Sequence, residues 1–94
     1  MPAATREGDI STGHDCHPPV NASEGSPNVF INGKPAHRVG DAWNPHSCGG
    51  PPHIPKTSVG SSTVFVNGQP ACRIGDMSDC GQASAEGSDD VFIG

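Results

Sequence analysis

GSPNVFINGKPAHRVGD, residues 25–41, returns nearly position for position as GSSTVFVNGQPACRIGD at residues 60–76. The chain ends with the first half of the same unit, GSDDVFIG at 87–94, and begins with its second half, PAATREGD at 2–9. The sequence therefore contains like units in triplicate, one of them divided between the termini. An open solenoid would have no reason to divide a unit in this way, so the repeats predict a ring closed about a pseudo-threefold axis, with adjacent termini.

Each unit has the pattern of a β-hairpin. Residues 29–31 and 64–66 are β-branched and aromatic, which favours short strands. An Asn-Gly dipeptide follows each of them and favours a type I′ turn, since both turn positions need a positive φ. Residues 34–39 and 69–74 are then expected to return as second strands, with their prolines next to the turn. No stretch has the periodicity of a long helix, so the predicted class is all-β, with short strands and long loops.

The composition fits one small domain, residues 1–94, with many tight turns. Its 94 residues include 13 Gly and 10 Pro, and a core this thin usually needs a disulfide, a metal or a partner as a staple. The net charge is −5 without any basic run, so nucleic acid is not expected as a partner. No apolar stretch is long enough to span a membrane. The N-terminus lacks the apolar core of a signal peptide, so we expect synthesis in the reducing cytoplasm.

An arginine precedes the Gly-Asp pair of every unit. The arginines are Arg6, Arg38 and Arg73, and the matching aspartates are Asp9, Asp41 and Asp76. One interpretation is a solvated strand face, and the other is a ring of Arg–Asp pairs that fixes the turns. Three like pairs do not form one catalytic site, so the predicted role of such a ring is structural.

Histidines and cysteines gather in the loops after the Gly-Asp pairs, which read GDISTGHDC at 8–16, GDAWNPHSC at 40–48 and, shorter, GDMSDC at 75–80. Alignment matches His14 with His46 and Cys16 with Cys48, and it places Cys80 with the cysteines and Ser78 with the histidines. Loops that leave like hairpins in one direction should converge at one end of the axis. In a reducing cytoplasm such a cluster favours metal binding over disulfides.

Structural zinc takes four Cys or His ligands in a closed tetrahedron, and two ligand sets are open. One set is His14, His46, His53 and Cys80. The other is Cys16, Cys48 and Cys80 with one histidine, which symmetry alone slightly favours because these cysteines are equivalent. The alternative to any site is that the histidines are surface loop residues.

The remaining candidates are weaker. His17 breaks the symmetry and is expected to be exposed. His37 and Cys72 fill the place that Thr5 fills in the divided unit, and we expect them to be strand side chains with no ligand role. Trp43 stands in the second loop, where it would shield a metal or line the interior.

These residues carry a family resemblance. The chain resembles the proline–alanine–alanine–arginine (PAAR) repeat proteins through PAATR at 2–6, PAHR at 35–38 and PACR at 70–73, each followed by a Gly-Asp pair. VFINGKP, VFVNGQP and VFIG accompany these motifs, so the resemblance extends over the whole chain. The chain departs from the family motif where His37 or Cys72 replaces alanine and where Thr5 lies between the alanines and the arginine.

The resemblance implies a compact cone that caps a trimeric β-helical spike. That spike is the valine–glycine repeat protein of type VI secretion systems or its equivalent in a contractile phage tail. The tip of such proteins holds zinc through three histidines and one cysteine, which favours His14, His46, His53 and Cys80. Cys16, Cys48 and His17 are then second-tier metal candidates, with the two cysteines buried or next to the ligands.

The implied function is mechanical. One copy of the chain would close the end of the trimeric spike with a partly apolar base, since open strand edges readily pair with further strands. The machine would drive this tip through a target membrane and out of the cell. In a phage, the chain would instead form part of the virion tail. We expect no fused toxin domain, although separate effector proteins are expected as possible cargo. The alternative is a free-standing zinc-binding module. A zinc hydrolase is not expected, because no glutamate lies inside a His/Cys loop to act as a base.

Overall fold

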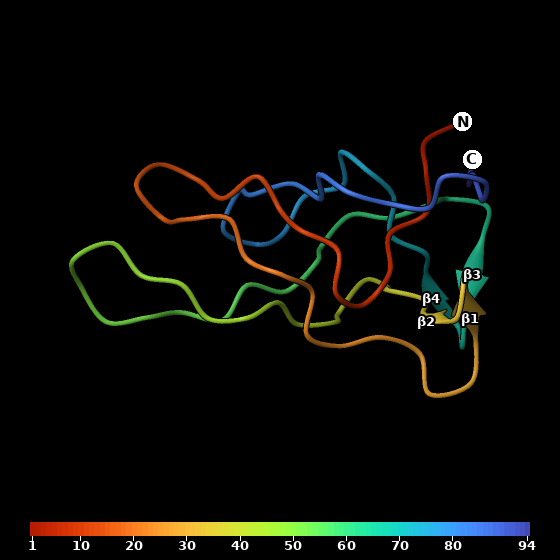
Figure 1. The fold of residues 1–94 in the computed structure, drawn as a ribbon, viewed down its shortest axis with the longest axis horizontal. Coiled ribbons are helices and arrows are strands. Elements are labelled where there is room, and N and C mark those ends of the chain that lie inside the picture. The colour runs from red at the N-terminus through yellow and green to blue at the C-terminus, as the bar shows by residue number, and fades with distance from the viewer.

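The computed structural model describes residues 1–94, and its principal extents of 37 × 24 × 21 Å make it elongated. Figure 1 shows its four short strands and both termini at one end of the longest axis, while loops 12–19 and 44–53 reach the other. We call these the strand end and the loop end, and the loop end includes the shorter loop 78–82. No helix that could cross a membrane is present. The chain is all-β, as predicted.

Two antiparallel hairpins form the regular structure. Strand β1 (Phe30–Ile31) pairs with β2 (Lys34–Pro35), and β3 (Phe65–Val66) pairs with β4 (Gln69–Pro70). The Asn-Gly turns between them have positive φ at both positions, 56° and 79° in the first hairpin and 54° and 80° in the second. These are the values that a type I′ turn requires, so the turn prediction is confirmed.

The divided unit closes between the two termini. Ala3 and Phe92 form an antiparallel bridge, and the amide of Ile93 donates to the carbonyl of Pro2 at 2.9 Å. The first and last residues therefore lie side by side, as the divided repeat predicts (Figure 1). This unit has a single bridge where the other units have a two-stranded hairpin.

The long second strands predicted over 34–39 and 69–74 are wrong, because each strand ends at its proline. After the proline the backbone turns to the neighbouring units. Bridges join Ala4 to Arg73, Arg6 to Ala36, and Arg38 to Ala71. The backbone groups that would have lengthened the hairpin are therefore satisfied by the neighbours.

Three of these inter-unit hydrogen bonds form a closed cycle. The amide of Thr5 donates to the carbonyl of Cys72 at 2.9 Å, Cys72 donates to His37 at 2.9 Å, and His37 donates to Thr5 at 3.1 Å. Of 41 backbone hydrogen bonds, only 4 lie within strands. Most backbone bonds thus lie outside the strands, and this cycle joins the three units to one another.

The apolar core is small and lies near the strand end. Each unit has a buried alanine directly before Thr5, His37 or Cys72. These alanines, Ala4, Ala36 and Ala71, pack with Val66 and Ile93. Alanine keeps the three backbones close enough to bond to one another. Most other buried side chains are polar, so this interior depends on satisfied hydrogen bonds more than on apolar volume.

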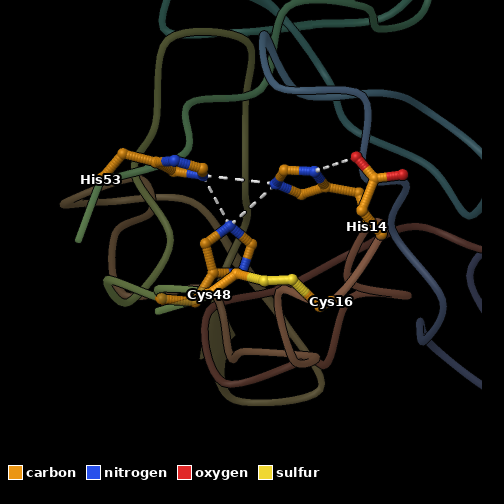
Figure 2. The surroundings of a disulfide bond; sticks show 6 residues. His14, Cys16, Cys48 and His53 are labelled. Atoms are coloured by element: carbon orange, nitrogen blue, oxygen red, sulfur yellow. Dashed lines mark hydrogen bonds and ion pairs between the residues drawn. A yellow bond between two sulfur atoms is a disulfide. The ribbon is translucent and has the colours of Figure 1, made fainter. Parts of the chain in front are cut away.

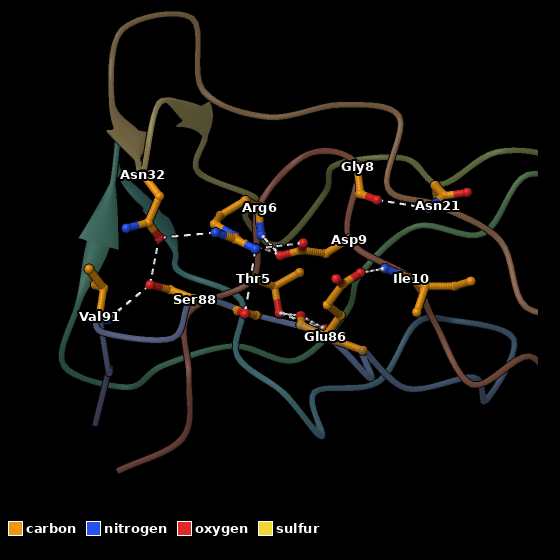
Figure 3. Close-up of polar contacts among 12 residues, drawn as sticks. Thr5, Arg6, Gly8, Asp9, Ile10, Asn21, Asn32, Glu86, Ser88 and Val91 are labelled. Carbon is orange, nitrogen blue, oxygen red and sulfur yellow. Dashed lines mark hydrogen bonds and ion pairs between the residues drawn. The ribbon is translucent and has the colours of Figure 1, made fainter.

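The predicted Arg–Asp pairs are all present. In each pair the arginine Nε donates to the aspartate at 2.9 Å, and Nη2 donates to the second carboxylate oxygen. The backbone amide of each arginine donates to the same aspartate. Figure 3 shows the Arg6–Asp9 pair, in which Arg6 Nη1 also reaches Asn32 of the first hairpin turn. Hydrogen bonding to the aspartate raises the pKa of Arg6, so the pair stays charged and fixes the turn.

Candidate metal centre

Short backbone pairings position the histidines of the two long loops. His14 and His17 face each other across the turn at Asp15 and Cys16, with reciprocal N–O distances of 3.2 and 2.7 Å. His46 and His53 pair in the same way at 3.2 and 3.1 Å across a longer loop. Each loop thus presents a pair of imidazoles from a fixed backbone.

Imidazole nitrogens from both loops meet at one point. The Nε2 atom of His14 lies 3.2 Å from that of His46 and 3.3 Å from that of His53, and the last two are 2.7 Å apart. Figure 2 shows the rings of His14 and His53 directed toward each other. Cys80 of the third loop joins them, so that all four ligand atoms lie within 4.8 Å of one another.

The tautomers of these rings suit a metal ion. His46 Nδ1 lies 2.9 Å from the carbonyl of Pro18, and since a carbonyl only accepts, Nδ1 carries the proton and Nε2 presents a lone pair. His14 Nδ1 faces the Asp15 carboxylate at 3.7 Å, which favours the same tautomer. Lone pairs brought this close repel one another unless a cation lies between them.

The spacing also fits a tetrahedral ion. Zinc–nitrogen bonds of about 2.0–2.1 Å place two nitrogens about 3.3 Å apart at a tetrahedron's edge. The distances from His14 to His46 and His53, 3.2 and 3.3 Å, match this edge, whereas the 2.7 Å between His46 and His53 is shorter and would have to widen around an ion. Burial, followed by the neighbouring His46, His17 and His14, lowers the pKa of His53, which favours the neutral ring that binds metal.

The prediction that Cys16 and Cys48 would avoid a disulfide is wrong. The structure pairs them as one, with a Cα–Cα distance of 5.5 Å that is normal for such a bond. Cys16 is exposed and Cys48 is half-buried, so they are also not both buried. The competing set of three cysteines is not assembled, because Cys80 gathers with the histidines.

The pairing could have been found from the sequence. Cys16 and Cys48 each lie two residues after a histidine, in loops that match. Loops that bring His14 and His46 together must bring these cysteines together too. We expected reduced cysteines instead, because the cytoplasm is a reducing compartment.

In the third loop, the predicted alignment of Ser78 with the histidines is wrong. The amide of Ser78 donates to the carbonyl of Gln82, a bond that Ser11 and Trp43 make with Val20 and Pro55 in the other loops. Ser78 therefore matches Ser11 and Trp43 and does not take a histidine's place. Cys80 reaches the cluster from a shorter loop that follows a different path.

The weaker candidates lie inside the molecule. His37 is buried between the Glu24 carbonyl, 2.7 Å from Nδ1, and the Thr57 hydroxyl, 2.8 Å from Nε2. The Trp43 ring is buried against His37, and its Nε1 donates to the same hydroxyl at 2.9 Å, so Trp43 lines the interior. Burial raises the pKa of Cys72 to about 12. Neither His37 nor Cys72 belongs to a group of potential metal ligands.

His17 is half-buried, although the sequence predicts exposure. Its ring stacks on that of His14, with centroids 4.2 Å apart. It groups with Cys16 and Cys48 as potential ligands and not with Cys80. The loop end therefore carries two groups of side chains that could bind a metal ion.

The strand end is apolar by contrast. Phe30, Phe65 and Phe92 take the same place in the three units, and each is about half exposed, at 56%, 56% and 50%. Met1, Val29 and Val64 of the same end are also exposed. The structure has no pocket, so this apolar surface is an open face.

Comparisons with known proteins identify the family. The search of curated proteins returned no match. The model of the PAAR motif matches residues 11–85, which include both long loops, both hairpins and Cys80. With most of its length inside that match, the chain belongs to the PAAR-motif family.

Proposed function

We propose that this chain is a structural spike-tip protein, which caps the trimeric β-helical spike of a contractile injection machine and holds a zinc ion at its loop end. Proteins of the PAAR family are structural components of the spike tips of secreted injection machines. One observation carries the proposal for this chain: the convergent imidazoles and the exposed phenylalanines lie at opposite ends of one elongated molecule. A tip needs that polarity, with a compact apex and an adhesive base.

The strand end is the proposed base. Its hairpins leave strand edges without partners, and such edges readily accept further strands. Three equivalent phenylalanines give the base three similar contact points for three identical spike chains, the valine–glycine repeat protein or its phage equivalent. A monomer on a trimer is the expected assembly. Effector proteins are expected as separate cargo.

The loop end is the proposed zinc site. Three imidazoles and one thiolate form a closed four-ligand set, which is typical of structural zinc, whereas catalytic zinc keeps an open position. Two of the glutamates are occupied elsewhere: Glu24 accepts from the amide of Ala42, and Glu86 accepts from the amide of Ile10. These contacts support a structural role in the tip over hydrolysis.

Binding to a purified trimeric spike tests the base. We expect Phe65→Asp to abolish binding and to leave the metal content unchanged, because it places a charge on the proposed contact face. Ile54→Asp is the matched control, since Ile54 is also 56% exposed but belongs to the residues after the second loop. Unchanged spike affinity in Phe65→Asp, Phe30→Asp and their combination would favour the free-standing zinc module.

Metal analysis of single variants tests the site. We expect about one zinc per chain in the oxidised protein, and its loss in His14→Ala, His46→Ala, His53→Ala and Cys80→Ser. Cys16→Ser and Cys48→Ser should retain that zinc. The ligand set is wrong if these two changes strip the metal while His53→Ala keeps it.

A further inference from the structure

A second cluster of metal-ligating side chains lies beside the four-ligand set. Cys16, Cys48 and His17 each bring one ligand atom within 4.8 Å of the other two. In the structure the two sulfurs form a disulfide, and in that state neither binds a metal ion, because the thiolate is the ligand. The cluster therefore has two mutually exclusive uses, and its oxidation state selects between them; Figure 2 shows the disulfide.

His17 gives an independent indication of a ligand. Its Nδ1 atom is buried and has no hydrogen-bond partner. It is the one buried side-chain nitrogen or oxygen of the molecule that lacks a partner. A buried polar atom without a partner is unfavourable and calls for an explanation. A cation at Nδ1 would give this nitrogen the partner that the disulfide state lacks.

The two sulfurs are accessible to small molecules and suit a soft ion. Cys16 is exposed and Cys48 half-buried, so thiols and disulfides in solution reach them. Thiolates select soft and borderline ions such as Zn²⁺. Two thiolates also carry the negative charge that balances a second cation close to the first.

We propose that reduced Cys16 and Cys48 form, with His17, a second and redox-controlled Zn²⁺ site, and that oxidation to the observed disulfide expels the ion. The inference goes beyond the proposed function, because neither the four-ligand set nor the spike contact depends on it. A chain made in a reducing compartment would carry this ion and exchange it for a covalent bond between the loops in an oxidising one.

The exchange balances with a small external disulfide as the oxidant. Cys16 Sγ attacks one sulfur of that disulfide and expels one small thiolate; Cys48 Sγ then attacks the Cys16 sulfur of the mixed disulfide and expels the second. The protein sulfurs lose two electrons, which reduce the small disulfide to two thiols. The two protons on those thiols come from solvent, and zinc leaves as Zn²⁺.

Metal counting on the full chain tests the proposal. The protein is loaded with excess Zn²⁺, either reduced with a phosphine or oxidised with glutathione disulfide, and then desalted. We expect two ions per chain in the reduced protein and one in the oxidised protein. Cys16→Ser, Cys48→Ser and His17→Ala should each hold one ion in both states, while Cys72→Ser, a buried thiol away from the loops, should behave as wild type.

The test separates this inference from the proposed function. His14→Ala should lose the other ion, and so hold one when reduced and none when oxidised. One ion in wild type in both states would overturn the second site and leave the four-ligand set intact. One ion in the reduced protein and none in the oxidised protein would overturn the four-ligand set and leave the redox-controlled site, because the single ion would then depend on the thiols of Cys16 and Cys48.

Cobalt substitution gives a second readout. The reduced protein loaded with Co²⁺ should show the thiolate-to-cobalt charge-transfer absorption of more than one sulfur. That absorption should fall when glutathione disulfide is added, in step with release of one Co²⁺ per chain. An absorption that is the same in Cys16→Ser as in wild type would contradict the second site even if all variants fold.

Discussion

The strand end and the loop end of this protein are stabilised by different kinds of interaction. The strand end has backbone bonds that pass from unit to unit, three buried alanines and charged pairs that fix the turns. The loop end contributes no residue to the apolar core cluster, and its histidines and cysteines meet through side chains from separate loops. We therefore expect the strand end to keep its structure without metal, whereas the loop end should depend on metal and redox state.

Removal of the metal should have the largest effect on this contrast. Structural zinc supplies roughly 10 kcal/mol or more of apparent folding free energy in small domains, which is comparable to the whole stability of a typical domain. We expect a chelator to lower the unfolding midpoint strongly. Hydrogen exchange should show that residues 12–19 and 44–53 lose protection first, while 35–38 and 70–73 keep theirs longest. Uniform loss of protection would contradict the contrast.

Reduction of the disulfide should matter most in metal-free protein. The cysteines are 32 residues apart, and closing a loop of this length stabilises a chain by about 3–4 kcal/mol. His14 and His46 are also 32 residues apart, so a metal ion between them already closes the same loop. In denaturant unfolding with a chelator present, Cys16→Ser should lose nearly all of this stabilisation relative to wild type. With Zn²⁺ present, the same variant should lose only a small part of it. An equal loss in both conditions would show that the metal does not join the two loops.

Loss of a buried charged pair should weaken the strand end without touching the metal. Asp9 and Arg6 have side chains only 1% and 10% exposed. Removing one partner of such a pair costs about 3 kcal/mol, because the other charge stays buried. We expect Asp9→Ala to lower the free energy of unfolding by this amount at unchanged metal content. Asp76→Ala is the matched control with a smaller expected loss, since Arg73 is 20% exposed.

The smallest expected effect is a pH dependence from His37. Burial lowers the pKa of His37, so the folded state binds its proton less readily than the unfolded state. The stability from neutral His37 is therefore complete above the unfolded pKa of about 6.5 and declines as the pH falls below it. The decline is at most about 1.4 kcal/mol per pH unit for one proton.

His37→Thr is the natural comparison, because Thr5 takes the same place in the cycle of backbone bonds. The loop histidines contribute equally to both proteins, so their contribution cancels in the difference between the two free energies of unfolding. We expect the variant to have the shallower pH dependence between pH 7 and 5, measured by denaturant unfolding. Identical slopes would mean that His37 does not resist protonation in the folded state.

The sequence predicted the strand end better than the loop end, for a physical reason. Repeats and Asn-Gly turns are local signals, and they gave the hairpins, the joined termini and the Arg–Asp pairs. The length of the second strands was wrong, because the bonds after Pro35 and Pro70 go to other units, which no local pattern records. The resemblance directed the choice of His53 over the cysteines, and the structure brings that side chain to the same point.

The loop end was harder because loop length changes the register. Ser78 was matched to the histidines by its distance from a cysteine, whereas its backbone bond shows that it matches Ser11. The polar chain from Trp43 through Thr57 to His37 was missed as well, since it joins residues that only the folded chain brings together.

X-ray absorption spectroscopy of the zinc-loaded, oxidised protein tests the central claim most directly. The claim is that one ion at the loop end is held by His14, His46, His53 and Cys80. The account predicts one zinc per chain with three nitrogen neighbours and one sulfur neighbour. A spectrum with two or more sulfur neighbours, or with an oxygen in place of the third imidazole, would contradict it.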